Sequence, residues 1–425
     1  MIQDMLDINF IRDNLDIVKE AARKKNVTIN LDELITLDEE RRQKQQLVDS
    51  LREEQNIVSK NVATADTSEI REQLIMEMRG LKENLQKHED ELKKVLSAWK
   101  LLMLQVPNVP DLSVPEGKSD ADNQPIRNWG EKPEFSFPIK DHVELMTALA
   151  MVDFERGTKV HGFRGYFLTG AGADLSWALW NYARDFFRER SFVSMMVPNI
   201  VRQQHFYGTG HLPNDAEDIF KTQDDDYLIG TSEVSAMAFH SDEVLSHQEL
   251  PKKYLGFSPC FRREAGSYGK DTKGLYRVHE FYKLEQIILC EASHELSVQF
   301  HEEITKSAED FIQSLGLPYQ VVLNCGGDLG LGQVKKYDIE VWTPSLATYR
   351  ESHSASYFHD FQTRRFNIKY RDSEGKMRFA HSLNNTAIAT PRILIALVEN
   401  FQQADGSIVI PQVLQKYMGK DRISL

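Results

Sequence analysis

The sequence predicts an α+β protein: an N-terminal antiparallel two-helix coiled-coil arm, followed by a larger domain with an antiparallel β-sheet flanked by helices. Three observations support this class. The first hundred or so residues contain two long runs with apolar side chains at 3-4 spacing. A proline-rich stretch follows them. Beyond it, short β-branched segments and helical segments occur without the regular alternation of βαβ units.

The arm is predicted from the two heptad runs, Leu34 to Val62 and Leu74 to Val106, of which the second is richer in apolar residues. Each helix should be about 45 to 50 Å long. The short polar segment "ATADTS" separates them and makes an antiparallel hairpin about 31–106. Periodicity alone favours a dimerisation or spacer arm. Residues 68–106 contain seven acidic and seven basic residues, so their charge does not favour RNA binding instead.

The domain boundary is expected where proline becomes frequent, near Pro110 to Pro115, which gives domains 1–112 and 113–425. In the second domain, "LSWALWNYARDFFRER" (175–190) and "ATPRILIALVENF" (389–401) have the apolar spacing of helices. The segments "YQVVLNC" (319–325), "KYDIEVW" (336–342) and "RFNIKYR" (365–371) have the composition of strands. These segments predict a sheet with helices packed beside it.

Composition limits the function. Of 425 residues, 41% are apolar and 10% aromatic, enough for sizeable cores. Cys260, Cys290 and Cys325 have neither disulfide nor metal-site spacing, which is typical of reduced thiols in a cytosolic enzyme. We expect no signal peptide and no membrane span. The net charge of −13 disfavours a general nucleic-acid binder but leaves room for a local basic surface.

The stretch "FRREAGSYGKDTKGLYRVHEFYKLEQ" (261–286) crowds charges around a glycine-rich connection. A hairpin with one strand from Leu275 to Glu285 would put alternate side chains on one face. That face could be a solvated sheet with cross-strand ion pairs, or a floor that binds a flat, charged ligand. The residues on it would be Arg277, His279, Phe281, Lys283 and Glu285, with Arg262 and Glu264 on the partner strand.

The connection itself, "GSYGKDTKG" (266–274), interleaves three glycines with Lys and hydroxyl residues and suits the wrapping of an anion. It is not a P-loop, because Gly269 and Lys270 are followed by Asp271. The segment "GGDLGLG" (326–332) likewise fails the dinucleotide fingerprint. Neither nucleotide-binding fold is therefore supported.

Two further clusters contain polar ligands. In "ESHSASYF" (351–358), Glu351 and the neighbouring serines offer the hard oxygen ligands that Mg²⁺ takes beside phosphates, although such stretches are often turns. In "LNNTAIATPRIL" (383–394), Asn384, Asn385 and Thr386 lead into an apolar helix that holds Arg392. That arginine is expected either in a buried ion pair or as a phosphate ligand.

Together these segments resemble the class II aminoacyl-tRNA synthetases in the form of the bacterial-type seryl-tRNA synthetase family. Residues 162–200 resemble motif 1, with Pro198 at its proline. Residues 261–286 resemble motif 2, residues 383–400 motif 3, and "GTSEV" (230–234) the loop for the amino acid. The N-terminal hairpin resembles the arm with which that family grips the extra arm of its tRNA. The resemblance covers nearly the whole chain.

The resemblance implies a role for each matching residue. Arg262 would hold the α-phosphate of ATP and the serine carboxylate. Glu264 would bind the adenine amino group, Phe281 and Arg392 would enclose the ring, and Arg277 and Arg392 would contact terminal phosphates. Glu351 and Ser354 would coordinate Mg²⁺. Serine would be received by Thr231, Glu233, Glu285, Asn384 and Thr386. The catalytic residues would be Arg262, Arg392 and Glu351.

The activity implied by the resemblance is serine-tRNA ligation in the cytoplasm, by a homodimer that takes part in protein biosynthesis. ATP is a substrate, Mg²⁺ accompanies it, and no zinc is expected. The RNA partner is tRNA(Ser), and tRNA(Sec) where present. Arg263, His353 and Tyr357 depart from the family pattern without replacing a site residue. Two rival hypotheses are a ligase that loads an amino acid onto a carrier protein and an inactive scaffold.

Overall fold

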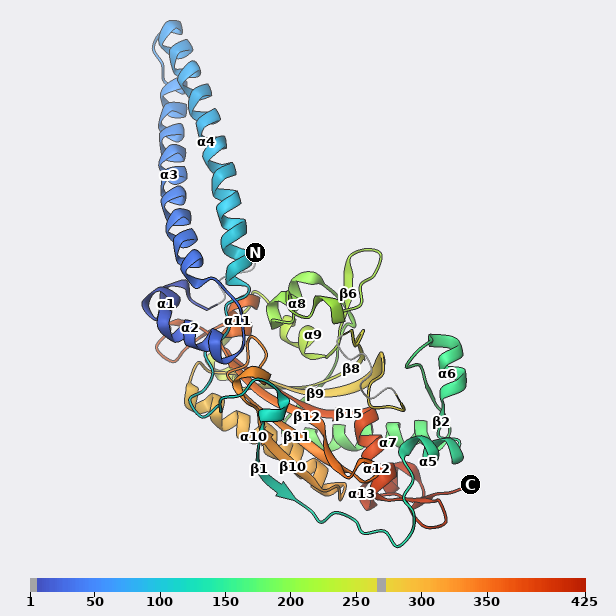
Figure 1. The fold of residues 1–425 in the computed structure, drawn as a ribbon. Helices are drawn as coiled ribbons and strands as arrows, with labels where there is room; N and C mark the ends of the chain where they lie inside the picture. The colour runs from blue at the N-terminus through green and yellow to red at the C-terminus, as the bar shows by residue number, and fades with distance from the viewer. Residues whose placement is uncertain (1–5, 266–272) are drawn as a thin grey trace. The chain divides into compact units, whose positions relative to one another are not determined.

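The computed structural model describes residues 6–265 and 273–425, and the chain divides into two compact units. The first unit comprises Asp7–Arg23 and Val27–Val106, and the second is formed mainly by Lys24–Asn26 and Pro107–Leu425 (Figure 1). Within the described ranges, no helix is both long enough and apolar enough to cross a membrane.

The first unit is helical and contains the predicted hairpin. Two short helices, α1 (Ile8–Asp13) and α2 (Leu15–Lys24), precede α3 (Leu31–Ala63) and α4 (Ser68–Met103). Helices α3 and α4 lie side by side, and their seam buries Val48, Leu51, Leu85 and Leu92. The predicted antiparallel coiled coil is thus confirmed, and α4 begins six residues before its heptad pattern becomes regular.

The second unit is built on an eight-stranded sheet in the order β1-β10-β11-β12-β15-β9-β8-β4. Every neighbouring pair is antiparallel except β4 and β8, which are parallel. The sheet agrees with the predicted α+β class. Its strands are β1 (Gln124–Trp129), β4 (Val193–Met196), β8 (Lys252–Phe261), β9 (Glu280–Cys290), β10 (Tyr319–Leu323), β11 (Lys335–Thr343), β12 (Thr348–His359) and β15 (His381–Ala389).

Three helices cover one face of this sheet: α7 (Ala171–Arg188), α10 (His294–Ser314) and α12 (Thr390–Asn400) (Figure 1). Their apolar side chains and the inward residues of the central strands form the main core, which includes Leu179, Phe311 and Ile395. A polar contact sits within it, because the Asn385 amide donates to Gln286 Oε1 and to the Ile304 carbonyl of α10, at 2.9 and 2.8 Å.

The opposite face is partly covered by α8 (Gln203–Thr209), α9 (Glu233–Ala238) and α11 (Phe361–Phe366), which share a second core with the small sheet β14-β13-β7. That sheet contains β7 (Val244–Ser246), β13 (Lys369–Arg371) and β14 (Met377–Phe379). The remaining elements are α5 (His142–Ala148), β2 (Val152–Asp153), α6 (Phe154–His161), β3 (Phe167–Leu168), β5 (Ile200–Arg202), β6 (Asp226–Leu228), β16 (Ile408–Val409), α13 (Gln412–Met418), β17 (Arg422–Ile423) and the 3₁₀ turns Asp120–Asp122, Ala216–Asp218, His247–Glu249, Gly326–Asp328 and Pro344–Leu346.

Most predicted elements are confirmed, and two are wrong in part. The segment "RFNIKYR" is a strand only from Lys369, because Arg365 and Phe366 end α11 and Asn367 turns the chain with a φ of 55°. The strand expected from Leu275 begins only at Glu280. Both errors occur where a backbone turn interrupts a segment whose composition suits a strand.

Candidate active site

The strand register gathers polar side chains on the sheet face that α9 and α11 partly cover. Directly paired residues in an antiparallel sheet project to the same side, and so do residues two apart along one strand. Glu285 pairs with Thr386, Asn384 with Ser356, and Ser354 with Asp338. Across four strands, this face therefore carries Phe281, Lys283, Glu285, Asn384, Thr386, Ser354, Ser356, Lys336 and Asp338.

A β-bulge adds Glu351 to the same face. The pairing of β11 with β12 passes from Ile339 and His353 to Glu340 and Glu351, which leaves Ser352 as the extra residue. Strict alternation along β12 would put Glu351 and Ser354 on opposite faces. The bulge reverses the alternation, so Glu351 lies on the face of its partner Glu340 and hence on that of Asp338 and Ser354. The two residues expected to bind Mg²⁺ thus lie on one face of the sheet.

Arg262 follows the end of β8 and reaches over this face. Its guanidinium carbon lies 5.3 Å from the centroid of the Phe281 ring, and its Nε donates to the Gly230 carbonyl at 3.3 Å. The backbone N–H of Arg262 donates to the His279 carbonyl at 3.0 Å, and this bond holds together the two chain segments beyond the strands. A cation beside a partly exposed aromatic ring suits a ligand with a phosphate next to a flat ring.

Glu264 and Arg277 lie outside the strands, contrary to the predicted hairpin alternation. They form an ion pair with Arg277 Nη1 3.0 Å from Glu264 Oε2, and Glu264 has a φ of 54°, which an extended strand does not allow. His279 is also outside β9, and its ring contacts the Arg262 carbonyl at 2.9 Å. The predicted anion-binding loop falls largely on residues 266–272, outside the described residues.

Two buried carboxylates occupy the end of the face near α9. Glu233, at the start of α9, accepts a hydrogen bond from Gln362 Nε2 at 2.6 Å. Glu285 forms an ion pair with Lys283, whose ammonium is also 3.5 Å from Thr231 Oγ1. Burial raises the pKa of both Glu233 and Glu285, although Gln362 and Lys283 respectively oppose the shift. Carboxylates held in such a place favour a cationic ligand group.

At the other end, Arg392 and Glu351 form a second ion pair. Arg392 lies in the first turn of α12, with Nη1 3.2 Å from Glu351 Oε2 and 2.9 Å from the Glu351 carbonyl oxygen. Desolvation opposes ionisation of Glu351, but the charges of Arg392 and Lys336 outweigh it and lower the pKa to about 2. Glu351 is therefore ionised at neutral pH. Arg392 was expected either in a buried ion pair or as a phosphate ligand. The ion pair with Glu351 is only partly buried, so this position fits both alternatives.

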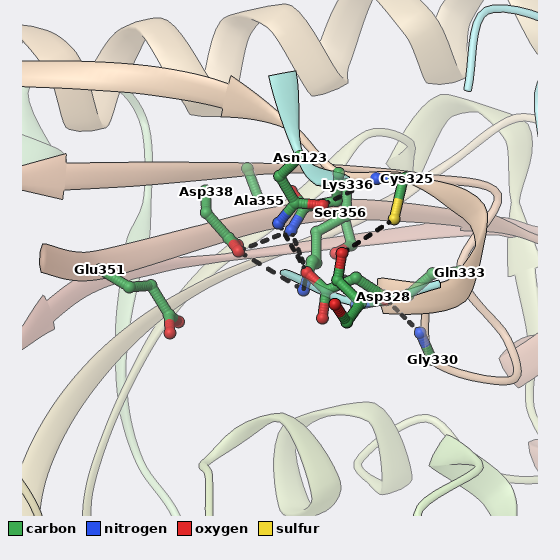
Figure 2. A network of polar contacts seen from close by, with 12 residues as sticks. Asn123, Cys325, Asp328, Gly330, Gln333, Lys336, Asp338, Glu351, Ala355 and Ser356 are labelled. Carbon is green, nitrogen blue, oxygen red and sulfur yellow. Dashed lines mark hydrogen bonds and ion pairs between the residues drawn. The ribbon is translucent and has the colours of Figure 1, made fainter. Parts of the chain in front are cut away.

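Several polar residues near Glu351 were not selected from the sequence. Figure 2 shows Lys336 between the carboxylates of Asp328 and Asp338, with Nζ–Oδ2 distances of 3.3 and 3.5 Å. Asn324 donates to both carboxylates at 2.7 Å. Burial, together with the nearby charge of Glu351, raises the pKa of Asp338 to about 6, while Lys336 opposes the shift. The alternation of Lys336 and Asp338 along "KYDIEVW" was the signal that could have found them.

The departures from the family pattern lie away from this face. Arg263 donates from Nη1 to the Glu217 carbonyl at 3.1 Å. His353 is fully buried, and its Nε2 contacts the Ala387 carbonyl at 3.0 Å. The Tyr357 hydroxyl donates to Asp111 Oδ2 at 2.9 Å. All three side chains have hydrogen-bond partners outside the polar face.

Chemically, the face combines cations, ionised and buried carboxylates, an aromatic ring and hydroxyl groups. Arginine and lysine can bind phosphates, and the hydroxyl and amide groups can form hydrogen bonds with a small polar ligand. Among residues 6–265 and 273–425, no three His, Cys, Asp or Glu side chains gather as a ready-made metal site. A metal here would need further oxygen ligands from a bound phosphate.

Comparison with known proteins agrees with this arrangement. Residues 219–401 match the family model "tRNA synthetase class II core domain (G, H, P, S and T)", and residues 5–110 match "Seryl-tRNA synthetase N-terminal domain". The chain is 44% identical over 416 residues to the serine–tRNA ligase of Deinococcus radiodurans, covering 98% of each protein.

Solved structures with the same fold include two related enzymes. One is the seryl-tRNA synthetase of Pyrococcus horikoshii complexed with ATP, with a TM-score of 0.88, 38% identity and 99% coverage of each chain. The other is the cytoplasmic serine-tRNA ligase of Naegleria fowleri in complex with AMP, with a TM-score of 0.85, 33% identity and coverage of 100% of this chain and 99% of the other. From the full-length identity and both family models, the chain belongs to the seryl-tRNA synthetase family of class II aminoacyl-tRNA synthetases.

Proposed function

We propose that the protein activates L-serine with ATP, releases pyrophosphate, and transfers the seryl group from seryl-adenylate to the 3′ end of tRNA(Ser), and to that of tRNA(Sec) where present. The observation that carries this proposal is the single site, on and around one sheet face, that combines Arg262, Arg392 and Glu351 with the buried carboxylates Glu233 and Glu285. Such a face offers partners for phosphates at one end and for an ammonium group at the other.

ATP would lie along the outer part of this face. Phe281 supports the adenine ring from below, and Arg392 encloses it and reaches the γ-phosphate. Arg262, 5.3 Å above the Phe281 ring, binds the α-phosphate. Glu264 accepts a hydrogen bond from the adenine amino group, and its ion-pair partner Arg277 binds the terminal phosphates. The nucleotides bound in the related structures, ATP and AMP, support an adenine nucleotide as the ligand.

Serine would lie between β9, β15 and the start of α9. Its carboxylate binds Arg262, and its ammonium group is attracted by the buried carboxylates Glu233 and Glu285. Because burial disfavours the charge on both glutamates, an added cation is the group that lowers their free energy. Thr231, Asn384 and Thr386 complete the pocket with short hydrogen-bonding groups. A site that hydrogen-bonds a hydroxyl disfavours alanine by leaving buried groups unpaired.

The residues present fit Mg²⁺. Glu351 is held ionised, and the β-bulge brings the Ser354 hydroxyl to its face. Asp338 is buried, and its Oδ1 has no hydrogen-bond partner within the described part of the chain. Hard oxygen donors of this kind suit Mg²⁺ and its bound waters. Glu351 and Ser354 would hold the ion, which when bound offsets charge on the phosphates.

Activation then depends mainly on positioning. A serine carboxylate oxygen attacks the α-phosphorus in line, the new P–O bond forms, and the bond to the pyrophosphate oxygen breaks. Arg262 contacts both the attacking group and the α-phosphate, so it orients the attack and stabilises the charge that develops. Arg277 and Arg392 hold the leaving pyrophosphate. In the second step the terminal ribose hydroxyl of the tRNA displaces AMP from the seryl-adenylate.

The tRNA would be held by the N-terminal domain, which we assign to 1–112 with its hairpin at about 31–106. The catalytic domain is then 113–425. The arm has no excess of basic residues, so tRNA binding by the arm would depend on the placement of individual charges and polar groups. We also place the enzyme in the cytoplasm, as expected for tRNA charging.

We further propose that two copies associate through the motif 1 region, 162–200. This region and the preceding α6 expose large apolar side chains beyond what an isolated surface residue explains. Val160, Trp177 and Met196 are 73%, 61% and 85% exposed, and Trp177 lines a cleft with Tyr166 and Pro391. Sedimentation should give twice the mass of the 49.0 kDa chain. A monomer at micromolar concentration would contradict this assignment.

Serine-dependent exchange of labelled pyrophosphate into ATP tests the proposed activity directly. We expect exchange with L-serine, none with alanine or glycine, and charging of tRNA(Ser). Faster exchange with glycine or alanine, and seryl transfer to a carrier protein, would support the carrier-loading alternative. An absence of exchange in folded protein would support an inactive scaffold. Replacing residues 31–106 by a short linker should abolish charging while exchange continues.

A further inference from the structure

A buried glutamate of α12 ties together segments that are far apart in the sequence. Glu399 is fully buried. Its Oε1 accepts hydrogen bonds from the backbone N–H of His142 and from the His142 ring, both at 3.0 Å. Its Oε2 accepts from the backbone N–H of Ser345 at 3.1 Å. The carboxylate therefore connects α12 to the start of α5 and to the turn between β11 and β12.

His142 extends this connection to the segment after the motif 2 loop. Its Nε2 accepts a hydrogen bond from the backbone N–H of Leu275 at 3.2 Å. With Nε2 acting as an acceptor, the ring proton of neutral His142 lies on Nδ1 and is donated to Glu399. His142 is 5% exposed and Leu275 is fully buried, so water does not compete for either bond. The result is a continuous relay from Glu399 through His142 to Leu275.

The neighbours of Leu275 fit the imidazole closely. Gly274 has a φ of 72°, and a Cβ at that position would lie 2.0 Å from His142 Nε2. Tyr276 packs edge-on against the imidazole, with ring centroids 5.5 Å apart, and its hydroxyl donates to Thr343 Oγ1 at 3.0 Å. Residues 274–276 are therefore anchored at consecutive positions rather than by one bond alone.

The relay joins two groups that the proposed function assigns to ATP. Arg392 and Glu399 lie on one face of α12, seven residues apart. At the other end, Arg277 follows Leu275 by two residues and forms its ion pair with Glu264. We propose that His142 is a positioning residue for ATP binding, which fixes Arg277 and Glu264 relative to Arg392. This inference rests on the proposed function for its effect on ATP.

His240 provides a matched control. It is 6% exposed, its Nδ1 contacts Glu243 Oε2 at 2.7 Å, and its Nε2 contacts the Tyr254 hydroxyl at 2.8 Å. It therefore has the same burial and the same kind of two-sided bonding as His142. No contact links it to residues 273–279 among those described. Losing this ring should affect stability without affecting ATP binding.

The test compares His142→Asn, His142→Gln and His240→Asn in the full-length protein. The Asn side chain retains a donor near the Nδ1 position but does not reach Leu275, whereas Gln retains an acceptor near the Nε2 position. We expect H142N to raise KM for ATP in pyrophosphate exchange about tenfold, with KM for serine within about twofold. H142Q should stay within about threefold of wild type, and H240N should leave both constants unchanged.

Hydrogen exchange gives a second readout that does not depend on activity. A peptide covering residues 273–281 should exchange faster in H142N than in wild type, H142Q or H240N. Gly274→Ala, whose Cβ intrudes on His142, should reproduce both effects if H142N folds poorly. An unchanged KM for ATP in folded H142N, or an equal increase in KM for ATP in H142N and H142Q, would overturn the inference. If wild type catalysed no exchange, the proposed function would fail, whereas the amide exchange would still report on the relay.

Discussion

The buried pair formed by Lys283 and Glu285 gives a prediction whose size follows from the structure. Lys283 is 8% exposed and Glu285 2%, and the two form an ion pair within the proposed serine pocket. Replacing Lys283 by Met keeps most of the buried chain length but removes the cation. Breaking a buried pair on one side costs about 3 to 5 kcal/mol, because the remaining charge is desolvated and unpaired. Burial already raises the pKa of Glu285, so it can take up a proton, and we expect the lower value, about 3 kcal/mol.

The loss of unfolding free energy corresponds to a decrease in melting temperature. The unit that contains the pair is formed mainly by Pro107–Leu425. For a unit of about 320 residues the entropy of unfolding is about 0.7 kcal/mol/K, so Lys283→Met should lower Tm by about 4 to 5 °C. Differential scanning fluorimetry measures such a shift. The double variant K283M/E285Q removes both charges and should regain most of the loss, but it should not regain activity.

Lys253→Met is the control, because Lys253 pairs with Glu303, whose side chain is 36% exposed. An ion pair with an exposed partner contributes at most about 1 kcal/mol, or about 1 to 2 °C here. The pH dependence has a definite sign. In K283M the raised pKa of Glu285 makes stability highest below its unfolded pKa and lower as pH rises, so the gap to wild type should narrow at pH 5.5. Equal shifts in K283M and K253M, or additive losses in the double variant, would refute the reasoning.

Three further predictions follow from the site and its surroundings. Arg262→Ala should lower pyrophosphate exchange at least about 100-fold, whereas Arg263→Ser should stay within about threefold, because only the first guanidinium faces the ligand; similar losses in both would contradict the assignment. Glu351→Gln should raise the Mg²⁺ concentration for half-maximal exchange at least about tenfold, and an unchanged Mg²⁺ dependence would exclude Glu351 as a ligand. Burial lowers the pKa of His301 to about 4, so stability should be lost as pH falls from about 6.5 towards 4. His301→Gln should flatten this part of a Tm–pH curve. An equally steep curve in the variant would show that other groups cause the loss.

The elements best predicted from the sequence are those whose pattern is local. The arm follows from heptad spacing, because the seam around Val48 and Leu85 is formed by residues of α3 and α4 themselves. The row Phe281, Lys283 and Glu285 follows from alternation, because β9 is regular and pairs with β8 without a shift at these residues. Alternation failed for Arg277 and His279, since β9 begins only at Glu280. Nothing in the composition of residues 275–279 signals that break.

The parts of the site that could not be predicted depend on pairing between strands. Glu351 and Ser354 share a face only because β11 and β12 shift register at Ser352, and a bulge of this kind has no sequence signature of its own. Lys336 and Asp338 share the face of Glu351 through the same pairing. The resemblance to the synthetases assigned Glu351 and Ser354 together to Mg²⁺, which stays a prediction, and it gave no reason for the two residues to share a face. The register supplies that reason.

The site explains how a chain with a net charge of −13 can hold polyanionic ATP. Four cations of the site are held in place by carboxylates rather than by an excess of positive charge, and Arg262 is held by the Gly230 carbonyl. The pairs are Arg277 with Glu264, Lys283 with Glu285, Lys336 with Asp338 and Arg392 with Glu351. In the proposed function, binding would exchange these partners: the arginines would pair with phosphates, and the carboxylates with the serine ammonium group and Mg²⁺. Because the paired groups are already ordered, this exchange requires little reorganisation, which is what catalysis by positioning needs. A ligand with phosphates but no cation would leave the displaced carboxylates without a cationic partner. ATP should therefore bind more tightly with Mg²⁺ and serine than alone.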